Sequence, residues 1–275
     1  MTGCRWLPDN YSEAEGRKEH SMIVYQCRDS LESIFTAVYN AYEEHRDHKD
    51  TRISLDEEYY LFAEYVPVET DPEKAQKVIR TLKRCFGEAD YLSICQALSS
   101  PEPDKAQAVY QTIVKGLKGK VRPGHLLDNL ADDDCHRTFS LARAAGRELQ
   151  HLYGFLRFQE IEGGILYAGI GPRHNLLPFL MPHFADRFPM ENFVIYDDNR
   201  GIFGIHPAGK EWYLAYGLEE PEEEGLAVSQ KESRIQELFR QFCRTIAIEE
   251  RENKKLQQNL LPLRFREYMP EFGPK

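Results

Sequence analysis

The sequence lacks the short motifs that identify common chemistries. None of its 6 cysteines stands in a C-x-x-C pair, so the ligand spacings of zinc ribbons and iron–sulfur clusters are absent. It contains no Walker loop, no dinucleotide-binding glycine fingerprint and no nucleophile elbow. No reaction can therefore be read from motifs, and the sequence does not decide whether the protein is an enzyme.

Long apolar runs are missing as well. Residues 1–20, MTGCRWLPDNYSEAEGRKEH, contain no apolar signal core, and no later window is apolar enough to span a membrane. Together with the unpaired cysteines, this favours a cytoplasmic location and no membrane partner. We expect residues 1–20 to be a polar, mobile extension.

Basic residues are fewer than acidic ones, 35 Lys and Arg against 45 Asp and Glu. The formal net charge is -10, and part of the excess is one acidic run at residues 219–224. This balance argues against indiscriminate nucleic-acid binding, but a local basic groove is compatible with it. Aromatic residues make up 12% of the chain, which favours large aromatic core contacts or stacking surfaces.

Apolar spacing in the first half of the chain is helical. A short β-rich run at residues 22–27 precedes a helix that begins after a capping box at residues 29–32. Asp71 and Pro72 mark a second helix start, and Gly87 predicts its end. Residues 70–120 therefore read as consecutive short helices, and Asp132 to Asp134 precede another one.

After Leu152 the apolar period changes to two, which is typical of strands. The turn at residues 197–201 predicts a hairpin, and a helix is expected at about residues 177–188. The strand candidates are GFLRFQEI, ILYAGIG, FVIYDD, GIFGIH and EWYLAYG. A capping box at Ser229 and Glu232 predicts a closing helix, followed by a tail too apolar to stay solvated.

These patterns predict an α+β fold, with an N-terminal helical region followed by a mainly antiparallel sheet with packed helices. We expect a single domain over residues 21–275. Its parts are helix-rich at 28–152, sheet-rich at 153–217, and a C-terminal helix and tail at 229–275.

A basic stripe is the first candidate binding surface. Arg143 and Arg147 share a helix face that carries no carboxylate, and a basic loop precedes that helix with Lys118, Lys120 and Arg122. The stripe fits contact with nucleic-acid phosphates. Two alternatives stay open: a solvated face, or pairing with Asp132 to Asp134.

Arg157 stands in an apparent aromatic strand, YGFLRFQ. One interpretation is a base-stacking platform with a phosphate-binding arginine. The alternative, which we favour, is an arginine that covers aromatic residues and pairs with an acid such as Glu160 or Asp197.

Histidines and paired aspartates are further candidates. His151, His174, His183 and His206 show no H-x-x-x-H spacing, so we assign no metal site and read them as structural. His183 and Arg187 share a helix face that suits an anion. Asp197 and Asp198 suit acid–base work or Mg²⁺, although turn chemistry explains them. If the chain is an enzyme, the catalytic candidates are His151, Arg157 and Asp197.

Five stretches of the sequence are distinctive in combination: DSLESIFTAVYNAYEEH near the start, VETDPEKAQKVIRTL, HLYGFLRF, NLLPFLMPHFADRF with the D-x-x-R-G hairpin, and the C-terminal IAIEERENKKLQQNLLPLRFREYMPEF. Through them the chain resembles a bacterial family of uncharacterised probable DNA metabolism proteins. The resemblance covers nearly the whole chain beyond residues 1–20.

That resemblance implies context more than chemistry. Members are encoded beside a radical S-adenosylmethionine protein thought to repair or modify DNA, and related domains are fused to uracil-DNA glycosylase-like domains. We expect a DNA repair accessory protein that binds single- or double-stranded DNA and this radical enzyme, with no cofactor of its own. The alternatives are an enzyme acting on a nucleotide or damaged base, and an oligomeric scaffold without nucleic-acid contact.

Overall fold

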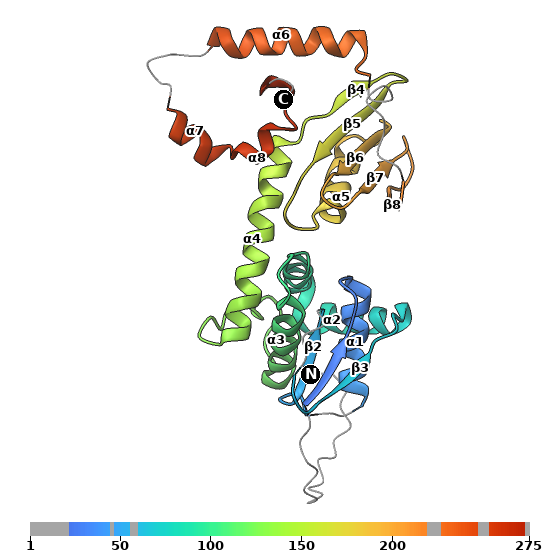
Figure 1. Cartoon of the computed structure of the whole chain (residues 1–275), viewed down its shortest axis with the longest axis vertical. Coiled ribbons are helices and arrows are strands. Elements are labelled where there is room, and N and C mark those ends of the chain that lie inside the picture. The colour runs from blue at the N-terminus through green and yellow to red at the C-terminus, as the bar shows by residue number, and fades with distance from the viewer. Residues whose placement is uncertain (1–21, 45–46, 56–59, 219–226, 247–252, 273–275) are drawn as a thin grey trace, which may run out of the picture. The chain divides into compact units, whose positions relative to one another are not determined.

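The computed structural model describes residues 22–44, 47–55, 60–218, 227–246 and 253–272. The expected extension at 1–20 and the acidic run at 219–224 lie outside the described residues. The chain forms two compact units, Met1–Ala145 and Gly146–Lys275 (Figure 1). The boundary falls inside helix α4 (Asp133–Phe155). A single domain over residues 21–275 stays a prediction.

The first unit contains a parallel sheet that the sequence patterns predicted only in part. Its strands are β1 (Met22–Gln26), β2 (Thr51–Ser54) and β3 (Ala63–Pro67), in the order β2-β1-β3. Both outer strands pair with β1 in parallel. Only β1 has an apolar run; TRIS and AEYVP are too short and polar to indicate strands without their partner.

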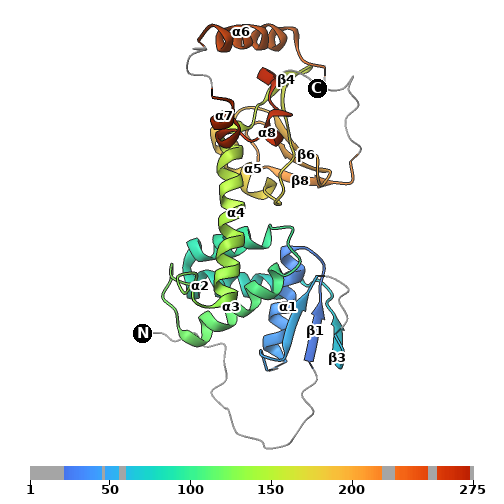
Figure 2. The same ribbon diagram turned by 60° about the vertical axis from the view of Figure 1, so that its left-hand side comes forward.

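Three helices accompany this sheet: α1 (Leu31–Glu43), α2 (Pro72–Leu98) and α3 (Lys105–Gly119) (Figure 2). Ser30 caps α1 by accepting the backbone N–H of Ser33, and Asp71 caps α2. Gly87 interrupts α2 with φ 84°, which only glycine adopts at little cost. The predicted helix starts and the predicted stop are confirmed.

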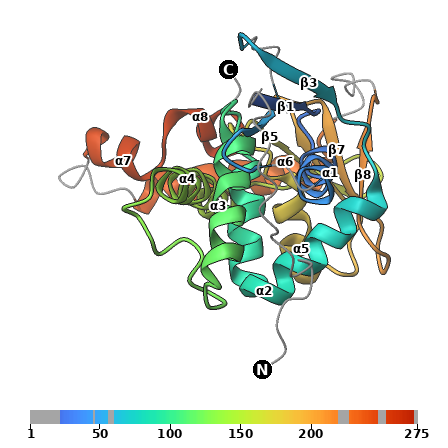
Figure 3. The same ribbon diagram turned by 90° about the horizontal axis from the view of Figure 1, so that it is seen from below.

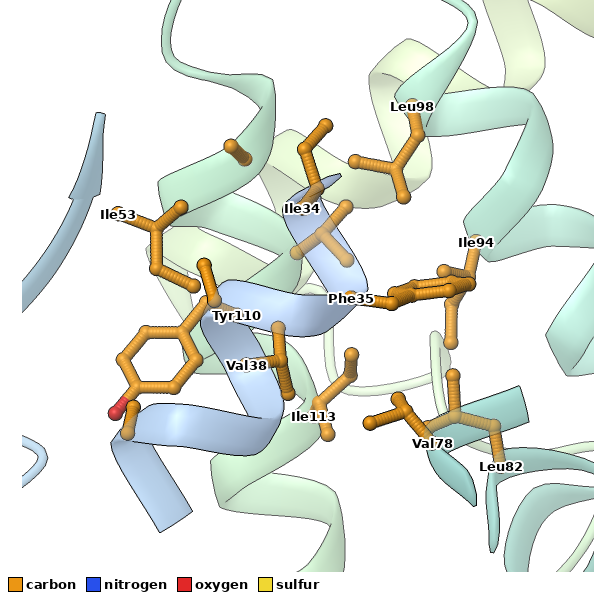
Figure 4. Packing of buried hydrophobic residues seen from close by; sticks show 14 of the residues in the cluster. Ile34, Phe35, Val38, Ile53, Val78, Leu82, Ile94, Leu98, Tyr110 and Ile113 are labelled. Carbon is orange, nitrogen blue, oxygen red and sulfur yellow. The ribbon is translucent and has the colours of Figure 1, made fainter. Parts of the chain in front are cut away.

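The core of the first unit lies where these helices meet the sheet (Figure 4). Ile34, Phe35 and Val38 project from α1 toward Ile53 on β2 and toward residues of α2 and α3. Tyr110 is fully buried in the same cluster. Close packing of one apolar face from each helix fixes this arrangement.

The second unit contains a five-stranded sheet in the order β4-β5-β6-β7-β8. Only β5 and β6 pair in parallel; the other three pairings are antiparallel. The strands are β4 (Gln159–Ile161), β5 (Ile165–Ile170), β6 (Phe193–Asp197), β7 (Ile202–His206) and β8 (Tyr213–Tyr216). The α+β class and the mainly antiparallel sheet are confirmed.

One helix covers one face of this sheet. Between β5 and β6 the chain forms α5 (Leu177–Arg187), which packs against β6 and β7. Figure 3 shows α5 beside β7. A Cβ added at Gly204 on β7 would lie 2.3 Å from the Met181 sulfur, so glycine permits the close approach. The expected helix at residues 177–188 is therefore confirmed.

The C-terminal region forms α6 (Gln230–Ile246), α7 (Lys254–Leu260), α8 (Leu263–Arg266) and the short 3-10 helix η3 (Pro270–Phe272). In the tail, Phe265 and Met269 are buried, whereas Leu260 and Leu263 are exposed. The tail is packed at its apolar centre and not along its whole length. The closing helix is confirmed as α6, and its apolar side chains Ile235, Leu238, Phe239 and Phe242 are exposed.

Candidate functional site

Polar groups of the second unit gather at the carboxyl ends of β5 and β6. Neighbouring parallel strands end there, and open α/β sheets bind ligands beyond such ends. The backbone N–H of Asp198 donates to the carbonyl of Ile170 at 2.9 Å, which joins the two strand ends. Side chains from α4, from the loop after β5 and from the C-terminal segment add to this edge.

The β6–β7 turn is built around Asp197. Its carboxylate is fully buried and accepts a hydrogen bond from Arg200 Nη1 at 3.1 Å. Burial raises the pKa of Asp197, although the hydrogen bond and charge of Arg200 act in the opposite direction. Arg200 also donates to the carbonyls of Pro172 and Arg173, so the turn is tied to the loop after β5.

A second buried carboxylate, Glu148 on α4, organises that same loop. Its carboxylate accepts hydrogen bonds from the backbone N–H groups of Arg173 and His174. It accepts a third from the ring nitrogen Nδ1 of His174, at 2.5 Å. Arg264 from α8 adds an ion pair at 3.1 Å. Burial alone would raise the pKa of Glu148, but the hydrogen bonds from His174 and Arg173 and the charge of Arg264 lower it to about 2.

Tyr268 attaches the C-terminal segment to the sheet. Its side chain lies against Gly169 and Gly171: an added Cβ would lie 3.1 Å from the ring at Gly169 and 2.4 Å from the hydroxyl oxygen at Gly171. Its hydroxyl donates to Asp198 Oδ2 at 3.0 Å. Burial and the neighbouring Asp198 raise the pKa of Tyr268, so the phenol keeps the proton that it donates.

A pocket of about 470 Å³ lies beside this contact, within the second unit. The face of the sheet opposite α5 forms its floor, with Tyr167 and Tyr196, and α6 forms one wall, with Gln236 and Arg240. The C-terminal segment forms another wall. The remaining lining residues are Gln159, Gly169, Asp198, Glu267, Tyr268, Met269 and Pro270.

The three catalytic candidates do not line this pocket. His151 packs against Phe155 and Phe265, with ring centroids 5.6 Å away in each case. Asp197 is sealed in the turn with Arg200. The structure therefore places His151, Arg157 and Asp197 in three separate structural contacts of the second unit.

Arg157 is not part of a strand. Helix α4 continues to Phe155, and β4 begins only at Gln159. The strand expected over YGFLRFQ is therefore wrong at its start, because Tyr153 and Phe155 belong to α4 and Arg157 lies in the short segment between α4 and β4. Arg157 pairs with Glu271 at 3.0 Å, so the favoured interpretation of an acid partner is correct in kind, but the partner is neither Glu160 nor Asp197.

The seven predicted nucleic-acid-binding residues are all exposed: Lys118, Lys120, Arg122, Arg143, Arg147, His183 and Arg187. Lys115, near the end of α3, binds Asp132 and Asp134 at the start of α4. Lys118 belongs to the last turn of α3 and not to the expected loop, which begins at Lys120, whereas Arg143 lies about 14 Å further along α4 than Asp134. The loop and the helix stripe are two separate basic groups.

In the second unit His183 lies against Tyr153, with ring centroids 4.2 Å apart. Arg187 follows one turn later on α5. His183 and Arg187 therefore share the exposed face that was predicted for them. Among the described residues no three His, Cys, Asp or Glu side chains come together as a metal site.

Sequence reasoning missed Glu148, Tyr268 and Arg264. Glu148 stands in an otherwise ordinary helical pattern, and its partners are 25 or more residues away. The spacing Gly169-x-Gly171 was the one available signal, because two glycines on one strand face permit a close neighbour. Nothing local indicated that this neighbour would be Tyr268.

Fold and site define an α+β protein whose second unit forms a polar pocket with its own C-terminal segment. Residues 103–271 match a family described as a domain of unknown function, DUF4130, and because the match covers more than half of the chain, the protein belongs to this family. No curated protein and no solved structure matches the chain. Within the part that the structure describes, no helix is long and apolar enough to cross a bilayer.

Proposed function

We propose that the protein binds nucleic acid through exposed basic side chains and serves as an accessory protein in DNA metabolism. One observation carries the proposal. Arg143 and Arg147 are exposed one turn apart on α4, and neither pairs with a carboxylate among the described residues. Two like charges at this spacing repel each other, so a polyanion would be a favourable partner.

Neighbouring acids do not provide the missing counter-charge. Asp132 and Asp134 bind Lys115 at 2.6 and 2.7 Å. Arg137, on the same helix, pairs with Asp104 at 2.7 Å. The alternative in which Asp132 to Asp134 neutralise the arginine stripe therefore has no support in the structure.

Salt-dependent DNA binding tests this proposal. Each phosphate contact adds about 0.9 to the slope of log affinity against log salt on duplex DNA, so Arg143→Ala with Arg147→Ala should reduce that slope by about 1.8. Sequence preference should change little, because phosphate contacts position and do not specify. Titrations on single- and double-stranded DNA at several salt concentrations measure both effects.

A matched control lies on α2. Arg80 and Arg84 are also exposed and four residues apart, so Arg80→Ala with Arg84→Ala changes the net charge equally. This control should keep the wild-type slope. If both double variants reduce the slope equally, net charge and not the position of the arginines determines DNA binding. If the wild type shows no salt-dependent DNA binding, the result favours the scaffold alternative.

The family resemblance extends the proposal to a partner. We infer that a radical S-adenosylmethionine protein for DNA repair or modification docks with this chain, as the resemblance implies. Co-purification of the two proteins, with and without DNA, tests it. If the two proteins co-purify under neither condition, the proposed interaction with this partner is overturned. The DNA titrations test nucleic-acid binding independently.

An enzymatic role for His151, Arg157 and Asp197 has weaker support. These residues would have to share a pocket to act together on a nucleotide or damaged base. None of them lines the pocket of the second unit. We therefore do not extend the proposal to catalysis by these three residues.

A further inference from the structure

The pocket in the second unit combines an aromatic floor with polar walls. Tyr167 on β5 and Tyr196 on β6 lie on the same sheet face, because Tyr196 pairs in register with Gly169, two residues beyond Tyr167. The Tyr196 ring stacks on Phe203 with centroids 4.6 Å apart. This stacking holds the floor in place and favours a flat ligand above it.

The wall facing this floor presents amide and guanidinium groups. Gln236 Nε2 donates to Glu232 at 3.0 Å and lies 3.4 Å from Gln159 Oε1. Arg240 Nη2 donates to Gln236 Oε1 at 3.3 Å. Arg240 Nε is buried and has no hydrogen-bond partner among the described residues. An unsatisfied buried donor beside a pocket is one that a ligand acceptor would satisfy.

Charge restricts the class of ligand. Two carboxylates, Asp198 and Glu267, line the pocket with one guanidinium, Arg240. A phosphate dianion would meet like charge there, whereas a neutral ring with donors and acceptors along its edge would not. The volume of about 470 Å³ is in the range of small-molecule sites.

We propose that this pocket binds an uncharged planar heterocycle with hydrogen-bonding edges, namely a nucleobase presented without its phosphate inside the pocket. The choice of a nucleobase rests on the proposed function, whereas the preference for a flat, neutral ligand rests on the pocket itself. Tyr167 stacks on the ring, Arg240 Nε donates to an acceptor on its edge, and Gln236 holds Arg240 in position through the hydrogen bond to its Nη2.

Binding of free nucleosides to the full chain tests the inference. The probes are deoxyadenosine, deoxyguanosine, deoxycytidine and thymidine, each beside its 5′-monophosphate, measured by calorimetry and saturation-transfer NMR. At least one nucleoside should bind saturably, and its monophosphate should bind at least about tenfold more weakly. A monophosphate that binds equally or more tightly would overturn the neutral-ligand assignment.

Variants place the binding in the pocket. Tyr167→Leu should weaken it about tenfold, because one base–aromatic stack has roughly this effect. Gln236→Leu on α6 should also weaken it, and it provides a second variant if the strand substitution does not fold. Tyr216→Leu, on exposed β8 of the same sheet, is the matched control and should bind as the wild type does.

The outcomes separate this inference from the proposed function. Nucleosides that bind while DNA shows no salt-dependent binding would support the pocket and refute the phosphate surface. The pocket alone would be overturned if DNA binds but no nucleoside binds saturably. It would also be overturned if Tyr167→Leu and Gln236→Leu bind the nucleoside as tightly as the wild type does.

Discussion

Glu148 Oε2 on α4 and His174 Nδ1 in the loop after β5 are 2.5 Å apart in the interior of the second unit. The same carboxylate accepts two backbone N–H groups and pairs with Arg264 of α8. One buried side chain thus joins a helix, a loop and the C-terminal segment. A buried charge with several donors is tolerated because each donor replaces lost hydration.

Replacing Glu148 should destabilise the fold in a pH-dependent way. Its pKa lies at about 2, below the ordinary value of 4.5, so the folded state favours the carboxylate. Its contribution is fully present above about pH 4.5 and is lost as the pH falls toward 2. Glu148→Gln should lower the free energy of unfolding by about 3 kcal/mol at pH 7, as measured by denaturant titration.

The control for this prediction is Glu162→Gln, at an exposed position beside β4. It should change stability by less than about 0.5 kcal/mol. The difference between wild type and Glu148→Gln should narrow below pH 4. A difference that stays constant down to pH 2 would contradict the assigned pKa direction.

Gly171→Ala should displace the C-terminal segment from the sheet. The new Cβ would lie 2.4 Å from the Tyr268 hydroxyl oxygen, so the tyrosine must move and its bond to Asp198 must break. We expect a lower melting temperature and faster proteolysis of the tail. Gly154→Ala should show neither effect, because a Cβ added there would meet no atom within 4 Å apart from its own helix backbone.

A double variant isolates the cause of that effect. Combining Gly171→Ala with Tyr268→Ala removes the clashing ring, so the glycine substitution should cost less in this background than in the wild type. Strictly additive losses would mean that Gly171 acts through something other than Tyr268.

Phe265→Ala should cost about 3 to 5 kcal/mol of folding free energy. Phe265 is buried against His151 and Phe155, so truncation leaves a cavity between α4 and α8. Phe272→Ala is the matched control. Because Phe272 is 49% exposed, its truncation should lower the folding free energy far less. Chemical denaturation measures both variants, and an equal loss of folding free energy in Phe265→Ala and Phe272→Ala would contradict the observed burial.

Truncation after Asn259 should lower the melting temperature by more than about 5 °C. It removes Phe265 and Met269 from the core and leaves Glu148 and Arg157 without their tail partners. Removing residues 273–275 alone is the control. An unchanged melting temperature after the longer truncation would instead favour a segment that binds a partner.

Where an element depends on neighbours in the chain, its residues were enough to predict it. Asp71 caps α2 through hydrogen bonds two and three residues away, and Gly87 ends its first part by its own φ. The turn after Asp197 follows the same logic, with Gly201 at φ 63°. Strands β2 and β3 were missed because their hydrogen bonds go to β1, not to their own neighbours.

Arg157 shows how the same limit applies to sites. Its spacing fits a strand, but α4 continues to Phe155 because buried helical contacts of Leu149 and Leu152 outweigh the local alternation. Its partner, Glu271, is 114 residues away. No local pattern could select it among the many acids of the chain.

The sequence by itself determined the α+β class, most helix limits, the hairpin and the exposure of the basic residues, since these follow from interactions within a few positions. Only the tertiary structure decided that Glu148, His174 and Arg264 meet, that Tyr268 docks on Gly171, and that a pocket forms between the sheet, α6 and the tail. The physical reason is that these contacts join segments far apart in the chain, and their stability depends on burial and geometry that arise when the segments pack.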